Sequence, residues 1–293
     1  MKRFVTLAAF AFAAGAQGAD LSASALSEGV VEAVQMPAWV ERGAARMPVA
    51  PGMSLRANDT LRTGPRARLL LLLAEGSRVK LGENGTLTLV AVGIRKDNIF
   101  VAAMNVLTGA FRFTTDVLAR ARGREIDIKI ASVTAGIRGT DLWGKATEDR
   151  DIVCLIEGKI EVQREGEAAF QMAEPRSFYV APRGAPALPV QPVDPSELTQ
   201  WAAETEIEPG KGAARRDGKW NVILASGESE NEVFAVYREV RAAGYPAEIS
   251  LRRVEGQRIY DVRITHLANQ EEAQALADGL DGQYGVALPR VTQ

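Results

Sequence analysis

The chain has 293 residues, with 35 Lys and Arg against 37 Asp and Glu, which gives a formal net charge of -2. This length favours two folded units, and the lack of a basic excess argues against nucleic acid as a partner. One histidine and one cysteine exclude zinc clusters, Cys/His nucleophile pairs and intramolecular disulfides. We therefore expect no metal and no cofactor, and we predict that the protein is not an enzyme.

The N-terminus has the residue order of a secretory signal peptide. Lys2 and Arg3 precede an apolar run of about 13 residues, and small residues follow it. Such a run is too short to cross a bilayer, which needs about 20 residues. We expect a signal peptide over residues 1–19, cleaved near Gly18 and Ala19, and a periplasmic protein without a further transmembrane segment. Retention of the signal peptide as an anchor is the alternative.

Residues 28–182 alternate apolar and polar side chains between short turns rich in Gly, Asn and Asp. This pattern is typical of many short β-strands. Its clearest example is residues 125–130, where three isoleucines alternate with three charged residues and so share one face of a strand. The segment predicts an all-β domain, either roll- or solenoid-like or a sandwich. Helical turns are expected only at residues 105–107 and 115–121.

Residues 183–218 have the composition of a proline-rich linker, with closely spaced prolines at its start. Dense proline favours an extended, semi-rigid chain over a packed core. A short helix is expected inside this segment, capped by Ser196 and ending near residue 203. We expect Trp201 of this helix to pack back onto a domain, because single exposed tryptophans are uncommon.

Residues 219–293 predict an α+β domain of the order strand, helix, strand, strand, helix, strand. Apolar spacing and capping residues predict helices that begin after Ser229 and near Asn269. The expected strands cover residues 220–225, 247–254, 258–264 and 286–291. These elements build one antiparallel sheet with both helices on one face, so the other sheet face is open to solvent or to a ligand.

Four stretches of the β segment point to a known family. They are Asn58-Asp59-Thr60-Leu61-Arg62-Thr63-Gly64, Ala74-Glu75-Gly76-Ser77, Arg138-Gly139-Thr140 and Ile156-Glu157-Gly158. With these the segment resembles the FecR-like domain of bacterial envelope proteins. The resemblance implies an all-β extracytoplasmic domain, best known from transmembrane regulators that relay a signal to a sigma factor. We do not expect that relay here, because no cytoplasmic segment precedes the signal peptide.

Within this segment, Arg138-Gly139-Thr140 is predicted to fix a turn, in which Gly139 supplies the dihedral freedom. A contact of Arg138 with a partner or ligand is the alternative.

The last segment contains the runs Arg238-Glu239-Val240-Arg241-Ala242-Ala243-Gly244-Tyr245-Pro246 and Tyr260-Asp261-Val262-Arg263-Ile264. It resembles the SPOR domain, a module that binds peptidoglycan glycan strands lacking stem peptides and recruits its host protein to the division septum. In the first strand, Ile223-Leu224-Ala225-Ser226-Gly227 keeps only the serine of the run that is common in that family. The resemblance implies a glycan site on the open sheet face.

Strand alternation places a small set of residues on this open face. The face is expected to hold Asn221, Ile223, Ala225, Arg252, Asp261, Arg263 and Thr265. The candidate glycan-binding residues are Asn221, Ile223, Ser226, Arg252, Asp261 and Arg263. An apolar side chain beside hydrogen-bond donors suits a sugar, whereas a solvated sheet face with an Asp261 to Arg pair is the plainer interpretation.

Two function hypotheses follow from the sequence. In the first, the protein binds peptidoglycan glycan strands through its C-terminal domain and presents the β domain in the cell envelope. In the second, the β domain is an envelope sensor or scaffold that binds a protein partner, and the C-terminal domain is only an interaction module. The lone His266 is expected in a loop, and Cys154 is expected to be a buried structural thiol.

Overall fold

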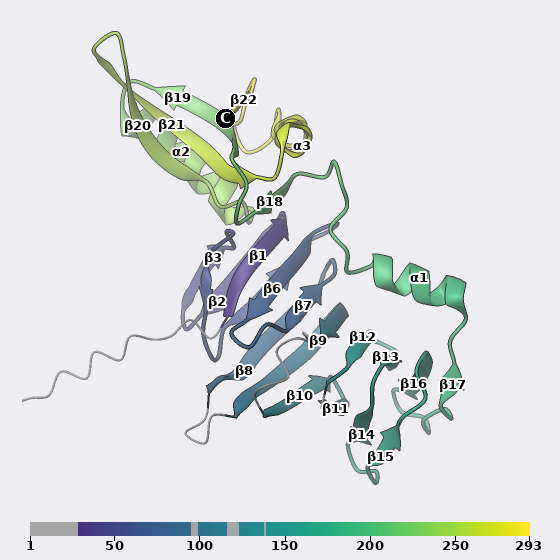
Figure 1. Cartoon of the computed structure of the whole chain (residues 1–293). Helices are drawn as coiled ribbons and strands as arrows, with labels where there is room; N and C mark the ends of the chain where they lie inside the picture. Colours follow the sequence, from purple (N-terminus) through teal and green to yellow (C-terminus); the bar gives the residue numbers. More distant parts are fainter. Residues whose placement is uncertain (1–28, 95–98, 116–122, 138) are drawn as a thin grey trace, which may run out of the picture.

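The computed structural model describes residues 29–94, 99–115, 123–137 and 139–293. The predicted signal peptide, residues 116–121 of the predicted second helical turn, and Arg138 lie outside the described residues. The chain forms an N-terminal β domain and a C-terminal domain with helices, as predicted (Figure 1). Among the described helices, none has the length and apolar character needed to cross a membrane.

The β domain consists of short strands joined by tight turns. Its strands are β1 (Gly29–Gln35), β2 (Ala38–Arg42), β3 (Ala45–Pro48), β4 (Ser54–Leu55), β5 (Thr60–Thr63), β6 (Arg68–Leu73), β7 (Arg78–Leu81), β8 (Thr86–Ile94), β9 (Phe100–Thr114), β10 (Arg124–Ile130), β11 (Val133–Ile137), β12 (Asp141–Ala146), β13 (Arg150–Glu157), β14 (Ile160–Arg164), β15 (Phe170–Met172), β16 (Ser177–Pro182) and β17 (Gln191–Pro192).

These strands form two sheets that share β9. Sheet A runs in the order β17-β16-β13-β12-β9-β7-β6-β1, and sheet B runs β3-β2-β5-β8-β9-β10-β11-β14-β15. All of these pairs are antiparallel except β9 with β10. Gly109 lies where β9 passes from sheet B to sheet A; its φ is +86°, and a Cβ there would lie 2.6 Å from the Gly85 Cα. Glycine is therefore required at this bend.

The core of the β domain lies between the two sheets. Ile126, Ile128 and Ile130 of β10 are at most 2% exposed, which confirms the alternation predicted for this strand. The helical turn predicted at residues 105–107 is wrong, because these residues lie inside β9, where their backbone pairs with β8 and β10. A short apolar and polar run is compatible with either structure, and strand pairing decides between them.

The C-terminal domain has the predicted order of elements. They are β19 (Trp220–Gly227), α2 (Glu230–Ala242), β20 (Glu248–Val254), β21 (Gln257–Leu267), α3 (Gln270–Leu280) and β22 (Arg290–Thr292). The sheet order is β20-β21-β19-β22, all antiparallel, and both helices pack on β19 from one side. Ser229 and Asn269 are the N-cap residues of the two helices, as predicted.

The last strand is shorter than predicted. It covers Arg290–Thr292, whereas the sequence favoured residues 286–291. The residues before it form a compact turn, in which the Gly282 N–H donates to the Val286 carbonyl and the Leu288 N–H donates to Asp281. These local hydrogen bonds use backbone groups that a longer strand would need for pairing.

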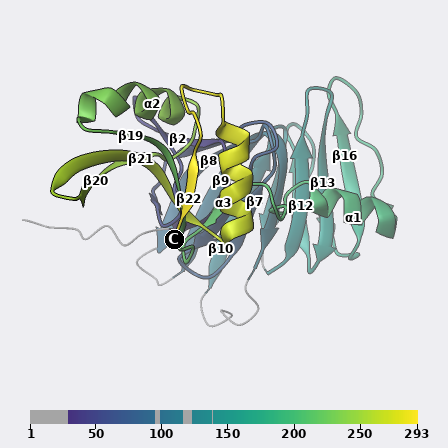
Figure 2. The same cartoon turned by 90° about the horizontal axis from the view of Figure 1, so that it is seen from above.

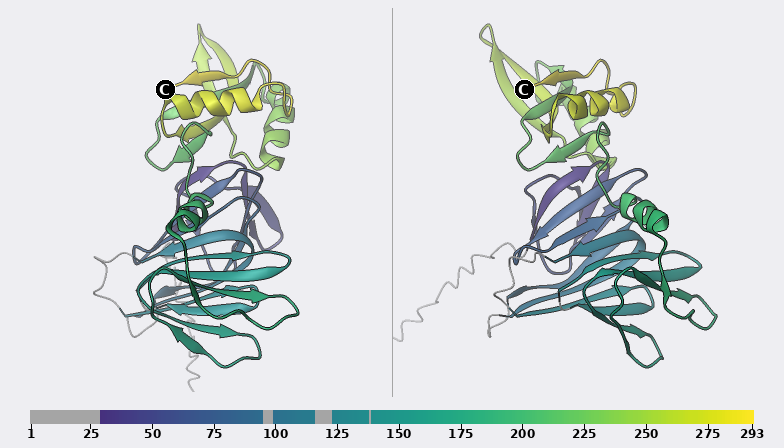
Figure 3. Two further views of the ribbon diagram at one scale, coloured as in Figure 1. Left: turned by 90° about the vertical axis from the view of Figure 1, so that its right-hand side faces the viewer. Right: turned by 45° about the vertical axis from the view of Figure 1, so that its right-hand side comes forward.

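The segment between the domains is packed, in place of the unpacked linker expected from its proline content. Its helix α1 (Pro195–Ala203) is capped by Asp194, two residues earlier than the expected Ser196. The Trp201 ring stacks on Trp143 of β12 with ring centroids 4.7 Å apart, which confirms that this tryptophan packs back onto a domain. Figure 3 shows α1 and the chain after it crossing over the strands toward the C-terminal domain.

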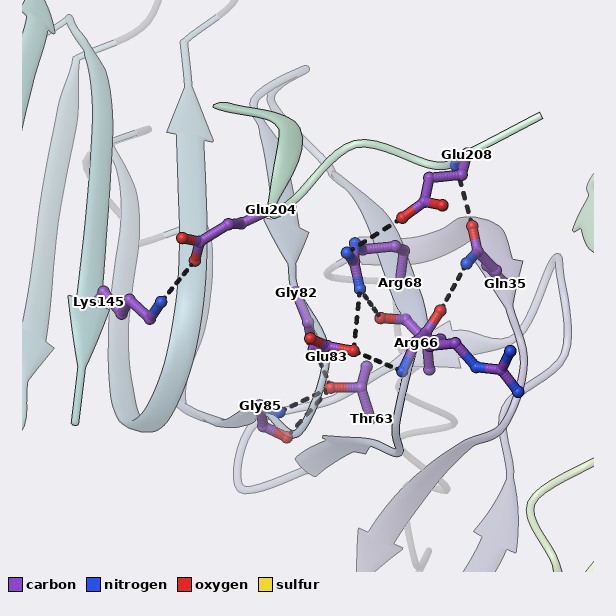
Figure 4. A network of polar contacts seen from close by, with 11 residues as sticks. Gln35, Thr63, Arg66, Arg68, Gly82, Glu83, Gly85, Lys145, Glu204 and Glu208 are labelled. Atoms are coloured by element: carbon purple, nitrogen blue, oxygen red, sulfur yellow. Dashed lines mark hydrogen bonds and ion pairs between the residues drawn. The ribbon is translucent and has the colours of Figure 1, made fainter. Parts of the chain in front are cut away.

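Three glutamates after α1 tie this segment to sheet A. Glu204 pairs with Lys145 at 2.8 Å, Glu206 with Lys80 at 2.5 Å and Arg112 at 3.4 Å, and Glu208 with Arg68 at 3.3 Å. We call these three residues the glutamate ladder, and Figure 4 shows its two ends. The three glutamates are two residues apart in the sequence, and their partners belong to four neighbouring strands of sheet A, in the order β12, β9, β7 and β6.

Exchanging the whole glutamate ladder for glutamine should weaken the protein modestly. The glutamate side chains are about half-exposed, so each ion pair contributes at most about 1 kcal/mol and salt screens it. We expect the Glu204→Gln, Glu206→Gln, Glu208→Gln variant to unfold at lower urea than wild type in low salt. The difference should shrink at high salt, and a salt-independent difference would contradict an ionic role.

The two domains are joined by a continuous sheet. Strand β18 (Ala213–Arg215) pairs with β1 along one edge, and Ala214 pairs with Leu267 of β21 on the other side. On α3, the 5%-exposed Glu272 accepts four backbone N–H groups from residues 210–213, at 2.8 to 3.1 Å. The chain entering β18 is therefore held by the C-terminal domain while β18 itself extends sheet A.

Candidate functional site

The open face of the C-terminal sheet carries a hollow of about 480 Å³. Its lining residues come from β19, β20, β21 and the C-terminal end of the chain at β22. The helices α2 and α3 lie on the other side of this sheet, and the β20–β21 hairpin projects from the domain (Figures 1 and 2). Five of the six candidate glycan-binding residues line it. The lining consists of Asn221, Ile223, Ser250, Leu251, Arg252, Asp261, Arg263, Arg290, Thr292 and Gln293.

A β-bulge in β19 decides which of its residues reach this face. Val222 and Leu224 are buried toward the helices, as alternation predicts. The pairing with β21 shifts between Ile223 and Ala225, so Ala225 lies opposite Val262 and packs against the core. The prediction that Ala225 faces outward is therefore wrong. The extra residue moves Ser226 opposite Asp261 instead, which places the serine on the open face.

Asp261 organises the centre of the face. The residue is 2% exposed, and its carboxylate accepts a hydrogen bond of 2.6 Å from the Ser226 hydroxyl and forms an ion pair with Arg252. Arg290 of β22 donates to the same Ser226 oxygen at 2.9 Å. Asp261 is therefore occupied by the protein's own side chains, and it fixes the positions of Ser226 and Arg252 on this face.

Arg290 also lines this hollow, although the sequence pattern does not single it out. It lies opposite Ile223 because β22 pairs with β19, and it is exposed. The predicted last strand did contain Arg290, but the sequence does not specify its register against β19. Only that register shows that Arg290 shares the face with Ile223 and Arg263.

The remaining polar groups surround one apolar side chain. Arg263 lies opposite Ile223 and pairs with Glu248 of β20 at 2.9 Å, while its side chain stays 39% exposed. Asn221 lies opposite Thr292 at the other end of the hollow. An apolar platform among amide and guanidinium donors suits hydroxyl and acetamide groups of a sugar. Among the residues that line the hollow, the only acidic side chain is that of Asp261, which already pairs with Arg252.

Two family models match separate segments of the chain. The model of the FecR protein family matches residues 59–161, and the SPOR domain model matches residues 217–288. The chain carries a FecR domain followed by a SPOR domain. Both are families of binding or regulatory domains. The open face described above is thus the exposed sheet face of the SPOR domain.

Solved structures similar to the chain include two crystal structures of a "putative anti-sigma factor" from Parabacteroides distasonis. They are 14% and 12% identical to this chain, and each alignment covers 68% of this chain and 96% of that protein with a TM-score of 0.41. Comparison with curated proteins finds no match.

The second candidate motif, Arg138-Gly139-Thr140, lies in the FecR domain. Gly139 has φ +98°, as expected for a turn glycine. The Thr140 N–H donates to the Thr115 hydroxyl at 3.0 Å, and that hydroxyl donates back to the Thr140 carbonyl. A Cβ at Gly158 would lie 2.5 Å from the Gly139 carbonyl oxygen, so this downstream glycine is required by the same turn. Gly139 and Thr140 therefore fix local structure.

The only cysteine and the only histidine of the chain lie in different surroundings. Cys154 is fully buried in sheet A beneath α1, and burial raises the pKa of its thiol to about 12. It is a buried structural thiol, as predicted. His266 lies within β21, so the loop predicted for it is wrong; it is exposed with φ +67°, and its Nδ1 contacts the Thr265 hydroxyl at 2.8 Å. Neither residue belongs to the open face.

Proposed function

We propose that the protein is an exported envelope protein that binds peptidoglycan glycan strands on the open face of its SPOR domain. It thereby holds the FecR domain at the cell wall in the periplasm, at division sites where denuded glycan is present. The observation that carries the proposal is the polar hollow around Ile223, which lies on a sheet face left free by both helices. The SPOR match supports peptidoglycan as the ligand class.

The face offers a sugar several kinds of contact. Ile223 supplies an apolar surface, and the exposed guanidinium groups of Arg263 and Arg290 supply donors on either side of it. Asn221 adds an amide that both donates and accepts. Arg252 and Asp261 act mainly on each other, so we assign them to positioning Ser226 and the β20–β21 hairpin.

A second candidate function is an envelope sensor or scaffold in which the FecR domain binds a protein. One observation favours it: Asp261 and Glu248 already pair with Arg252 and Arg263, which leaves fewer donors for a sugar. In that case the SPOR domain would serve only as an interaction module. The two candidates differ in whether the purified protein binds glycan at all.

Co-sedimentation with purified sacculi tests the proposal. We expect the mature chain to sediment with sacculi, and more strongly after an amidase has removed the stem peptides. The Ile223→Ala, Arg263→Ala, Arg290→Ala variant should bind roughly tenfold more weakly, because it loses the apolar platform and two donors. Binding of wild type to neither preparation would favour the sensor function.

A matched control comes from the same hairpin. Arg253 is exposed on β20 next to Arg252, but it does not line the hollow. Arg253→Ala removes one positive charge from the domain without changing the open face. It should therefore sediment like wild type, and equal losses in both variants would indicate nonspecific charge attraction.

A further inference from the structure

Strand β20 forms one edge of the SPOR sheet. Within the part of the chain that the structure describes, it pairs only with β21, and all seven of its residues take part without a shift of register. Figures 1 and 2 show β20 on the outside of the SPOR domain, remote from β12–β16 of the FecR domain. The outer side of β20 therefore presents backbone N–H and C=O groups to which a further strand can pair.

The two edges of this sheet differ in how they are protected. β22 at the opposite edge has only three residues and follows Pro289, and both features prevent the addition of a strand. β20 has seven residues, no proline and no bulge. It also carries exposed apolar side chains, since Leu251 is 52% exposed and Val254 is 40% exposed. A long, regular and partly apolar edge favours pairing with another strand.

The side chains of β20 alternate between the two faces of the sheet. Glu248, Ser250 and Arg252 belong to the open face, as their positions opposite β21 show. Ile249 and Leu251 belong to the helix side, where Ile249 packs against the core. The open-face row therefore has an acid at one end, a serine at its centre and a base at the other end.

This row is complementary to a second copy of itself that runs antiparallel. When a two-fold axis passes at Ser250, Glu248 of each copy lies opposite Arg252 of the other copy. On the helix side, Ile249 of each copy then lies opposite Leu251 of the other. An axis one residue away in either direction separates the opposite charges, and an axis at Arg252 places two arginines against each other. The charges therefore select one register.

Both charged groups retain exposed surface for a partner outside their own domain. Arg252 donates to Asp261 through Nε, and its side chain is 42% exposed. Glu248 contacts Arg263 through Oε1, and its side chain is 49% exposed. A guanidinium has several N–H donors and a carboxylate has a second oxygen. An ion pair between two copies would therefore add to these contacts without replacing them.

We propose that the protein forms a dimer in which the β20 strands of two copies pair antiparallel, with Ser250 on the two-fold axis. The two SPOR sheets become one continuous sheet, and an axis perpendicular to it keeps both open faces on the same side. Because Ser250 and Arg252 line the hollow, the hollows of the two copies lie next to each other across the paired strands. The dimer does not require glycan, but it would present two glycan sites side by side.

Sedimentation velocity of the full mature chain over a concentration series tests for the dimer. We expect the mass to double as the concentration rises into the micromolar range, and to increase no further because each copy has one β20 edge. Leu251→Lys should raise the dissociation constant at least about tenfold, because a charge replaces an apolar contact between the strands. Leu288→Lys is the control: Leu288 is 84% exposed outside β20, so this variant should dimerise like wild type.

Disulfide formation tests the position of the axis. Residues directly opposite each other in an antiparallel pair have Cα atoms about 4.5 to 5.5 Å apart, which is within disulfide range. Ser250→Cys should therefore give a covalent dimer under mild oxidation. Val254→Cys lies on the same face, but its two copies would be about 26 Å apart, so it should give none. Cys154 does not interfere, because burial raises the pKa of its thiol to about 12.

A mixture of two single variants tests the register. Glu248→Cys and Arg252→Cys should cross-link with each other, and the mixed dimer keeps one of the two ion pairs. Neither variant should cross-link with itself, because two copies of either residue would lie about 13 Å apart.

Three results would overturn the proposal. One is a wild type that stays monomeric over the whole concentration series, and another is an assembly that grows beyond two copies. The third is a dimer in which Ser250→Cys cross-links no faster than Val254→Cys, because the copies would then meet through another surface. All of these measurements are made without glycan, so their failure would not contradict peptidoglycan binding by the open face.

Discussion

Replacing Glu272 with glutamine should destabilise the joint between the two domains by about 3 kcal/mol. The Glu272 carboxylate accepts the N–H groups of Gly210, Lys211, Gly212 and Ala213, all at 3.1 Å or less. A glutamine of the same size has only one acceptor oxygen and turns an NH₂ group toward backbone donors. At least one buried N–H would lose its partner, which is the costly outcome for a buried donor.

Hydrogen exchange of residues 210–213 measures this effect directly. We expect their amides to exchange faster by about two orders of magnitude in Glu272→Gln, while amides in the core of β9 keep their protection. Limited trypsin digestion gives a second readout, because the exposed Lys211 lies inside the loop that Glu272 holds. Cleavage after Lys211 should separate the FecR and SPOR halves more rapidly in the variant.

The neighbouring Glu271 supplies the control. It is exposed in the same first turn of α3, and it accepts none of these four hydrogen bonds. Glu271→Gln makes the same charge change at the same helix end, so it should leave exchange at residues 210–213 near the wild-type rate. Equal acceleration in both variants would show that helix charge, and not the buried carboxylate, stabilises the loop.

Local periodicity predicted most of the SPOR half. The apolar stripe of α2 and the alternation in β21 are properties of single elements, so the order of elements and the buried face follow from the sequence. The bulge at Leu224 could not be predicted, because it depends on pairing with β21. That one extra residue reverses the orientation of Ala225 and Ser226, and so changes the candidate site.

Ion pairs between residues far apart in the sequence explain why the sequence does not predict the packing of residues 183–218, the segment between the domains. Its prolines favour an extended chain, and the structure contains a short extended strand, β17, before α1. The segment packs because Glu204, Glu206 and Glu208 form ion pairs with cationic side chains of strands β6, β7, β9 and β12. Those cations lie about 60 to 140 positions earlier in the sequence, so no local pattern connects them to the glutamates. Glu272 is a similar case, since its partners are backbone groups of another segment.

Replacing Trp201 with alanine should uncover Cys154. Trp201 stacks on Trp143 with an interplanar angle of 7°, and Phe178 meets its edge at 5.5 Å. Cys154 lies in the same cluster and is fully buried. Loss of the indole should weaken the attachment of α1 by about 3 kcal/mol, because a large side chain packed against an apolar cluster is removed.

Thiol labelling reports this change, because Cys154 is the only cysteine in the chain. In the wild type, burial raises the pKa of the thiol to about 12, so very little thiolate is present near neutral pH. When α1 detaches, water reaches the sulfur and the pKa falls toward its ordinary value. Both changes act in the same direction, so we expect a disulfide reagent at mildly alkaline pH to label Trp201→Ala at least about tenfold faster.

The control separates detachment of α1 from general loss of stability. Phe234 is a 43%-exposed aromatic residue on α2, remote from this cluster, and Phe234→Ala should label at the wild-type rate. Far-ultraviolet circular dichroism should show an intact sheet in both variants, since β12 and β13 remain paired without α1. If Cys154 stays unreactive in a folded Trp201→Ala protein, the paired strands alone protect the thiol. The connecting segment would then be held by its glutamate ladder and by Glu272, and not by the tryptophan stack.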